Sequence, residues 1–156
     1  MVFPCSVRPM RAADLQRVAA IDAADPSPWS YGQMASELGQ ESGWQLVAVP
    51  LGQDDLVCGF ICGRIAAGEA ELFKIAVDVE CRRRGVASLL LASSIELLAV
   101  RGVQRIFLEL RTANLGAKAL YERFGFQEVG VRKNYYLIPP DNALIMEKVI
   151  VEGVSS

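Results

Sequence analysis

The sequence predicts a single α/β domain of the mixed (α+β) kind, with a central sheet of six or seven strands. Strand-like and helix-like apolar runs follow one another in the order β-α-α-β-β-β-α-β-α-β-β. Three of the strand-like runs are consecutive, without a helix between them, which favours hairpins over a doubly wound parallel sheet. A length of 156 residues, of which 52% are hydrophobic, suits one domain with a substantial core.

The N-terminal part of the chain predicts a strand and two helices. Residues 3–8 have the composition of a short strand, and apolar residues recur at helical spacing through residues 10–24. The proline-containing segment DPSPWS then ends this helix. Ser30 and Gln33 have the spacing of a capping box, which predicts that a second, short helix begins here.

The middle of the chain predicts three strands joined by hairpins, followed by a long helix. The strand-like runs cover residues 44–49, 56–65 and 70–79, and polar segments containing glycine separate them. A helix is expected from about residue 85 to residue 100, because the segment is strongly apolar and Gly102 follows it as a C-cap.

The last third of the chain predicts a strand, a helix and two further strands. Residues 103–111 alternate apolar and polar side chains, as a strand with one buried face does. Asn114 suits the N-cap of the helix that follows. Two final strands, at residues 126–133 and 143–151, are expected to flank a loop at residues 134–142.

Composition narrows the possible functions. The chain contains no histidine, which excludes Ser-His-Asp catalysis and the commonest ligand of transition metals. A net charge of −2 argues against a nucleic-acid partner, and the sequence lacks a membrane-spanning run or a signal peptide. The four cysteines are few and unevenly spaced, as reduced structural cysteines are. We expect a cytoplasmic, metal-free domain over residues 1–150 and a C-terminal tail at 151–156.

Three consecutive arginines and a glycine directly precede the long central helix. A strand, a tight loop and a helix N-terminus present free backbone N–H groups and the positive end of the helix dipole, which together favour a phosphate. The segment lacks the glycine pattern of a dinucleotide fold and the lysine of a P-loop. Pattern alone therefore leaves two readings open, a phosphate site and a solvated basic loop.

The segment RRRGVA matches the Q/R-x-x-G-x-G/A signature of the GNAT superfamily of acyl-CoA-dependent N-acyltransferases. The segments ELFKIAVD, LELRTAN, ALYERFGF, RKNYY and ALIMEK resemble, in order and spacing, the bacterial ribosomal-protein-alanine acetyltransferases of the RimI type. The resemblance covers nearly the whole chain. It implies a GNAT fold, acetyl-CoA as co-substrate, no metal, and direct transfer of acetyl to the N-terminal alanine of a small-subunit ribosomal protein.

The resemblance also assigns roles to individual residues. It implies that Glu109 is the general base and Tyr121 the general acid. The aromatic residues Trp29, Tyr135 and Tyr136 are candidates to line the acceptor groove, since exposed aromatic side chains suit peptide binding. The resemblance implies that the pantetheine arm is contacted by Ile75, Ala76 and Val77. It implies that the pyrophosphate is bound by Arg83, Arg84, Gly85, Val86, Ala87 and Ser88, and that Asn114 makes a further coenzyme contact.

Elementary chemistry agrees with these roles. An α-amino group has a pKa of about 8 and must lose a proton before it attacks a thioester. Without histidine, a carboxylate such as Glu109, on the polar side of an apolar strand, is a natural acceptor of that proton. A phenol with a pKa of about 10 can protonate a departing thiolate, for which Tyr121 is the candidate.

Each of these residues also has a structural interpretation, and the residues alone do not choose between the two. Glu109 could be a solvent-facing strand residue, Tyr121 a core aromatic, and Asn114 an N-cap alone. Trp29 and Tyr135 could equally pack at an edge of the core. The alternatives for the whole protein are a GNAT enzyme for other protein N-termini, lysines or small amines, and a non-catalytic acetyl-CoA-binding module.

Overall fold

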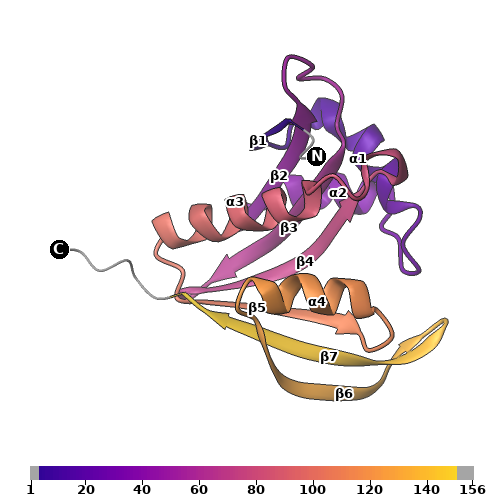
Figure 1. Ribbon diagram of the computed structural model, residues 1–156, viewed down its shortest axis with the longest axis vertical. Coiled ribbons are helices and arrows are strands. Elements are labelled where there is room, and N and C mark those ends of the chain that lie inside the picture. Colours follow the sequence, from indigo (N-terminus) through magenta and orange to yellow (C-terminus); the bar gives the residue numbers. More distant parts are fainter. Residues whose placement is uncertain (1–3, 151–156) are drawn as a thin grey trace.

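The computed structural model describes residues 4–150 and contains the predicted order of elements, with seven strands (Figure 1). The elements are β1 (Cys5–Pro9), α1 (Leu15–Asp22), α2 (Tyr31–Leu38), β2 (Gly43–Pro50), β3 (Gly59–Ala66), β4 (Glu69–Val77), α3 (Val86–Val100), β5 (Arg105–Arg111), α4 (Leu115–Arg123), β6 (Gln127–Leu137) and β7 (Pro140–Val149). The predicted tail, residues 151–156, and residue 3 of the first predicted strand lie outside the described residues.

The seven strands form one sheet in the order β1-β2-β3-β4-β5-β7-β6. All neighbouring pairs are antiparallel except β4 and β5, which are parallel and are connected by α3. Helices α3 and α4 cover one face of the sheet, and α1 and α2 lie behind the first half of its other face (Figure 1). The mixed α/β prediction is therefore confirmed.

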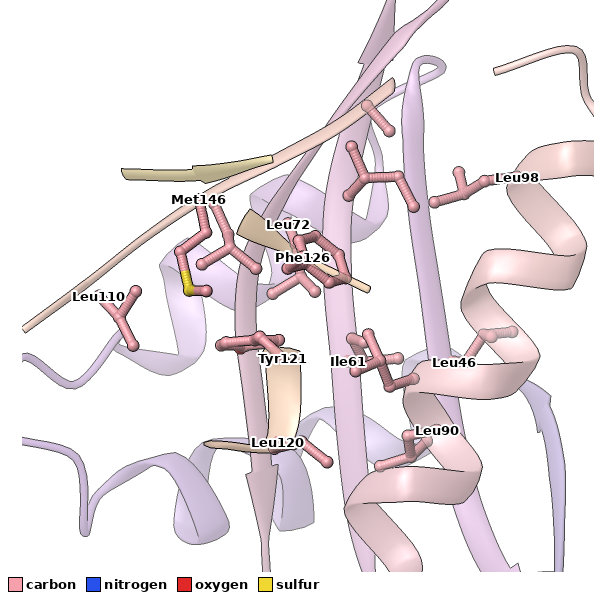
Figure 2. Close-up of a cluster of buried hydrophobic side chains, with 14 of the residues drawn as sticks. Leu46, Ile61, Leu72, Leu90, Leu98, Leu110, Leu120, Tyr121, Phe126 and Met146 are labelled. Atoms are coloured by element: carbon pink, nitrogen blue, oxygen red, sulfur yellow. The ribbon is translucent and has the colours of Figure 1, made fainter. Parts of the chain in front are cut away.

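Two apolar clusters join these layers. The larger fills the space between the sheet and helices α3 and α4, with Tyr121 and Leu120 of α4 beside the strand residues (Figure 2). The smaller lies beneath α1 and α2. The larger cluster includes Leu46, Ile61, Leu72, Leu90, Leu98, Leu108, Phe126 and Met146, and the smaller includes Val18, Ile21, Met34, Val47 and Phe60. Burial of these side chains is the main force that holds helices to sheet.

A β-bulge in β4 separates that strand from β5. In the pairing with β3, Cys62 lies opposite Lys74 and Gly63 opposite Leu72, so Phe73 is the extra residue. Such a bulge bends the strand that carries it. The parallel pairing of β4 with β5 extends only as far as Leu72 opposite Leu108. The two strands therefore diverge just beyond the bulge and leave an opening in the middle of the sheet (Figure 1).

The predicted loop at residues 134–142 is wrong in large part. Strand β6 continues to Leu137 and β7 begins at Pro140, so the connection is a tight turn at residues 138–139. The register shifts between Arg132 and Tyr136, and the backbone of Asn134 has a φ of +55°. Asparagine and proline in this segment are typical of loops, but the irregularity accommodates them within a hairpin.

The ends of the first two helices are fixed by polar contacts. The predicted capping box is confirmed, since the Gln33 N–H donates to Ser30 Oγ at 3.1 Å and the Ser30 N–H donates to Gln33 Oε1 at 2.8 Å. At α1, the helix begins later than predicted because a 3-10 turn, Ala12–Asp14, precedes it. The Arg11 N–H donates to the Asp14 carboxylate at 2.7 Å across this turn.

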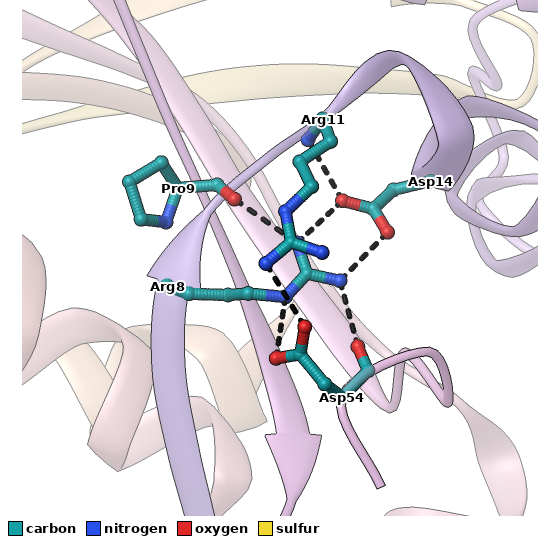
Figure 3. A network of polar contacts seen from close by, with 5 residues as sticks. All are labelled: Arg8, Pro9, Arg11, Asp14 and Asp54. Atoms are coloured by element: carbon teal, nitrogen blue, oxygen red, sulfur yellow. Dashed lines mark hydrogen bonds and ion pairs between the residues drawn. The ribbon is translucent and has the colours of Figure 1, made fainter.

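Asp14 also anchors strand β1 to the start of α1. The Arg8 guanidinium donates two hydrogen bonds to the Asp14 carboxylate, at 2.7 and 2.8 Å, and reaches Asp54 between β2 and β3 (Figure 3). Asp14 is buried, so this two-pronged pairing compensates for the loss of water around its charge. The network ties three separate segments together at the N-terminal edge of the sheet.

Candidate active site

A cavity of about 810 Å³ lies beside the opening between β4 and β5. We call it the larger cavity. Its walls come from the last residues of β4, the arginine loop with the first turn of α3, the helix α4, and the α1–α2 loop (residues 23–30). It is lined by Ile21, Ala24, Asp25, Pro26, Ile75, Ala76, Val77, Cys81, Arg82, Arg83, Gly85, Val86, Ala87, Ser88, Gly116, Ala117, Leu120 and Arg123.

All the residues that the resemblance assigned to coenzyme contacts line this cavity except Arg84 and Asn114. The cavity also has walls that sequence reasoning missed. These are the α1–α2 loop, at Ala24 and Pro26, and the face of α4 that carries Gly116 and Arg123. No sequence motif marks those residues, because it is the packing of α1 and α4 around the opening that brings them to the cavity.

The arginine loop prepares the start of α3 for an anion. Arg83 and Gly85 both have positive φ, of +62° and +77°, so the chain turns sharply into the helix. Gly85 occupies the N-cap position and has no side chain to bond the first N–H groups of α3. The first bond of the helix runs from the Leu89 N–H to the Gly85 carbonyl, at 3.0 Å. The N–H groups of the first turn therefore remain available to a ligand in the cavity.

The pairing of β3 with β4 determines which N–H groups face the opening. The Asp78 N–H donates to the Cys58 carbonyl at 2.8 Å. Bonded and non-bonded pairs alternate along an antiparallel ladder, so the next pair, Gly59 and Val77, is not hydrogen-bonded. The N–H groups of Val77 and of Ile75, two residues earlier, therefore point away from β3 toward the opening that β5 has left.

The N-terminus of α4 forms the opposite wall. Asn114 Oδ1 accepts a hydrogen bond from the Ala117 N–H at 3.2 Å, which confirms the predicted N-cap. This contact uses the side-chain oxygen of Asn114 within the protein. Gly116 and Ala117, in the turn that Asn114 caps, line the cavity instead of Asn114 itself.

Glu109 lies on the other face of the sheet. Ile106, Leu108 and Leu110 of β5 are buried toward α3 and α4, and strand alternation turns the half-buried Glu109 to the opposite side. There it lines a smaller cavity of about 440 Å³, together with Glu71, Phe73, Phe107 and Arg132, among others.

Two residues of β6 interact with the Glu109 carboxylate. Arg132 Nε lies 3.2 Å from Glu109 Oε1, and Tyr135 is close enough to feel the charge of the same carboxylate. The negative charge of Glu109 is the main reason that the pKa of Tyr135 is raised. Burial and the charge of Glu109 likewise raise the pKa of Glu71, its neighbour in the smaller cavity. Glu109 thus belongs to a compact group of charged and hydroxyl side chains.

Tyr121 is buried in the larger apolar cluster, with 4% of its surface exposed, and its ring centroid lies 5.5 Å from that of Phe126. Burial, and to a lesser extent the nearby Tyr136, raises its pKa well above the ordinary value, so its hydroxyl keeps its proton. Tyr121, on α4, and Glu109, on β5, therefore lie on opposite sides of the sheet. The charge of Glu109 contributes, after burial, to a raised pKa of Tyr136.

Trp29 belongs to the α1–α2 loop. Its ring packs edge-on against Phe73 at a centroid distance of 5.9 Å, and the Lys74 ammonium lies 5.4 Å from the ring centroid. Lys74 Nζ also forms an ion pair with Asp22 at 3.0 Å, and the Asp22 carboxylate accepts a hydrogen bond from the backbone N–H of Trp29 at 2.7 Å. Trp29 is therefore held in place next to the bulge of β4. Tyr135 packs edge-on against Tyr136 at a centroid distance of 5.1 Å, and the Arg132 guanidinium lies 5.7 Å from its ring centroid.

Three further properties complete the description of the site and its surroundings. Among residues 4–150, no group of three or more His, Cys, Asp or Glu side chains could hold a metal ion. Within the same part of the chain, no helix is both long enough and apolar enough to cross a membrane. All four cysteines are free.

A parallel strand pair that diverges at a bulge, beside a helix N-terminus without a side-chain cap, defines an acyltransferase of the GNAT class. The sequence model of the Acetyltransferase (GNAT) family matches residues 15–126, and the chain belongs to that family. This confirms the resemblance seen in the sequence, and GNAT acetyltransferases use acetyl-CoA as the acetyl donor.

Similar proteins are known by sequence and by structure. A [ribosomal protein bS18]-alanine N-acetyltransferase of Salmonella typhimurium is 38% identical over 70% of this chain and 71% of its own length. One of Haemophilus influenzae is 35% identical over 88% and 93%. The crystal structure of the ribosomal-protein-S18-alanine N-acetyltransferase of Escherichia coli superimposes with a TM-score of 0.86, at 31% identity, over 97% of this chain and 98% of that one.

Proposed function

We propose that this protein transfers the acetyl group of acetyl-CoA to the N-terminal alanine amine of ribosomal protein bS18. The acceptor is inferred from the relatives that carry this activity in their names and share 35–38% of their residues over most of the chain. One structural observation carries the proposed chemistry. A cavity suited to a phosphate-bearing ligand lies on one side of the opening in the sheet, and a half-buried glutamate lies on the other. We also propose a cytoplasmic location, because the proposed acceptor is a ribosomal protein.

The larger cavity would hold the coenzyme mainly through the backbone. The N–H groups of residues 83–88, at the turn into α3, would bind the pyrophosphate, and Gly85 permits the turn because its φ is +77°. The edge of β4 at residues 75–77 would run beside the pantetheine arm. The Val77 N–H, which points into the opening, would donate to the thioester oxygen as negative charge develops there. The coenzyme supplies the activated acetyl group.

Glu109 would act as general base. The α-amino group of the acceptor has a pKa of about 8 and attacks only after it has lost a proton, which Glu109 would accept directly or through one water. The acceptor would approach between the α1–α2 loop and strand β6, where Trp29 and Tyr135 lie. Arg132 Nε, 3.2 Å from Glu109 Oε1, helps to hold the carboxylate in place.

Tyr121 would complete the reaction as general acid. As the new amide bond forms, the bond between the acetyl carbon and sulfur breaks, and the thiolate of coenzyme A needs a proton. The buried hydroxyl of Tyr121 keeps its proton at neutral pH, because burial raises its pKa.

Release of free coenzyme A thiol with different acceptors tests the proposed function. The acceptors are a bS18 N-terminal peptide that begins with alanine, the same peptide with a blocked N-terminus and an internal lysine, and a small primary amine. We expect rapid release of coenzyme A with the peptide that begins with alanine and no release with the other two acceptors. Release with the blocked peptide or the small amine alone would assign the enzyme to another amine. No release with any of them, despite tight coenzyme binding, would favour a binding module.

A further inference from the structure

The side chain of Arg111, the last residue of β5, joins two segments that are far apart in the sequence. Its Nη1 donates to the Pro139 carbonyl at 2.6 Å, and its Nη2 donates to the Ile138 carbonyl at 3.1 Å. Nη2 also donates to Ser27 Oγ at 3.1 Å. One guanidinium group therefore bonds both the β6–β7 turn (residues 138–139) and the α1–α2 loop.

The β6–β7 turn has little apolar packing of its own. Leu137 and Ile138, at its tip, are 79% and 82% exposed. The start of β7, just after the turn, is held separately, because the Thr112 hydroxyl and the Ala113 N–H both donate to the carboxylate of Asp141. Polar bonds from Arg111 are thus what fixes the tip of the turn.

Arg111 also packs against Tyr136. The guanidinium carbon lies 4.1 Å from the centroid of the Tyr136 ring, within the range of a cation–π contact. Tyr136 stands near the end of β6, just before the β6–β7 turn. This contact therefore also holds the strand that leads into the turn.

The α1–α2 loop is bound from both sides of the opening in the sheet. Lys74 of β4 donates to the Ser27 carbonyl at 2.9 Å, and Arg111 of β5 donates to the Ser27 hydroxyl at 3.1 Å. The loop thus bridges the two strands where they have diverged (Figure 1). Ala24 and Pro26, just before Ser27, line the larger cavity, and Lys74 holds that part of the loop through Asp22 as well.

On the basis of the proposed function, we propose that Arg111 is a positioning residue for the acceptor. It holds the α1–α2 loop and the β6–β7 turn together on the acceptor side of the opening, so that both are ordered before the peptide arrives. Lys74 fixes the coenzyme side of the same loop. The two roles are separable. The side chain of Arg111 contacts Ser27, Tyr136, Ile138 and Pro139, and none of these residues lines the larger cavity.

The guanidinium group suits this task better than an ammonium group. Its planar fork reaches two carbonyls and a hydroxyl at once while its face stacks on an aromatic ring. A lysine at position 111 can donate to a carbonyl, but it cannot make the whole set. Arg111→Lys should therefore restore part of the function that Arg111→Gln loses.

The test compares Arg111→Gln and Arg111→Lys with Arg105→Gln. Arg105 lies on the same face of β5, makes an ion pair with Glu147 at 2.7 Å and contacts neither segment, so it is a matched control. We expect Arg111→Gln to raise KM for the acceptor peptide about tenfold, to change kcat by less than about threefold and to leave the Kd of acetyl-CoA within about twofold. Arg111→Lys should be intermediate, and Arg105→Gln should resemble the wild type.

Amide hydrogen exchange of the free protein supplies a measurement that needs no acceptor. Arg111→Gln should speed exchange in peptides covering residues 24–30 and 137–142, whereas Arg105→Gln should not. Unchanged exchange in both segments, or a KM that does not change while acetyl-CoA binding weakens, would overturn the proposal. If the wild type acetylates no peptide, the proposed function fails, and the exchange measurement still decides whether Arg111 orders the two segments.

Discussion

Arg132 Nε, on β6, lies 3.2 Å from Glu109 Oε1, on β5, and both residues line the smaller cavity. The two strands are not neighbours in the sheet, because β7 lies between them. A long arginine side chain thus spans one strand to reach the proposed base. This relationship distinguishes Glu109 from a simple solvent-facing strand residue, since its half-buried carboxylate is held by a cation.

The first prediction concerns Glu109 and Tyr121. Glu109→Gln and Tyr121→Phe should each lower kcat by roughly 100-fold or more, because each removes a proton acceptor or donor from the transition state. Acetyl-CoA binding should survive in both variants, because Glu109 lines only the smaller cavity and Tyr121 lines neither. Steady-state kinetics and calorimetric titration provide the comparison. Unchanged turnover in both variants would show that the acid–base assignment is wrong.

The second prediction separates backbone from side chain in the arginine loop. Gly85→Val should weaken acetyl-CoA binding much more than Arg84→Ala. A valine is strained at a φ of +77°, and a shifted loop would misdirect the N–H groups at the start of α3. Arg84 is exposed and does not line the larger cavity. Thermal unfolding of Gly85→Val should be measured alongside binding. Equal losses in the two variants would indicate that the arginine side chains hold the coenzyme.

The third prediction concerns Asn114, which caps α4. Asn114→Asp preserves the capping oxygen, whereas Asn114→Ala removes it at a cost of about 1 kcal/mol of unfolding free energy. If capping is the whole role of Asn114, the aspartate variant should bind acetyl-CoA as the wild type does. The resemblance instead predicts a coenzyme contact, in which case the added negative charge of Asn114→Asp should weaken binding while stability is retained. Chemical denaturation and coenzyme titration of the two variants distinguish these roles.

The fourth prediction concerns stability and pH. Burial alone would raise the pKa of Asp14, but hydrogen bonds from Arg8 and from the Arg11 N–H outweigh it and hold that pKa below its usual value (Figure 3). A carboxyl whose pKa is lower in the folded state stabilises the fold above the unfolded pKa of about 3.9, and this contribution is lost as the pH falls through the folded pKa. Asp14→Asn should therefore lose about 3 kcal/mol of unfolding free energy at pH 7.

The matched control for this prediction is Asp54→Asn. Asp54 belongs to the same network, but its side chain is 57% exposed, so its loss should cost less than about 1 kcal/mol. The difference between wild type and Asp14→Asn should start to shrink near the unfolded pKa of about 3.9 and disappear as the pH falls through the lower folded pKa, below which the wild-type carboxyl is protonated in both states. Equal losses from the two substitutions at pH 7, measured by urea unfolding, would contradict this account.

The order of elements could be predicted because it depends on local patterns. Alternation in β5, the capping box at Ser30 and Gln33, and the N-cap at Asn114 are each contained within a few residues, and all three appear in the structure. The two last strands were predicted, but their continuation through residues 134–142 was not, because those residues have loop composition. The pairing there depends on a local shift of register between the two strands.

In the candidate site, too, the parts that depend on local motifs could be predicted and the parts that depend on long-range contacts could not. The loop at Gly85 and the strand edge at Val77 could be predicted because they carry a recognisable motif. The bulge at Phe73, which opens the sheet, depends on the register between β3 and β4 and leaves no mark in either strand alone. The contacts of Lys74 and Arg111 with Ser27 join residues 47 and 84 positions apart, so they emerge only from the folded chain.

The most direct test of the account is to locate the acetyl group on one peptide that offers both kinds of amine. The peptide carries an N-terminal alanine and an internal lysine, and fragment-ion mass spectrometry after incubation with the protein and acetyl-CoA identifies the modified nitrogen. We predict acetylation of the α-amino group, with the lysine unmodified and with the product nearly absent for Glu109→Gln. Acetylation of the lysine with a free N-terminus would contradict the central claim.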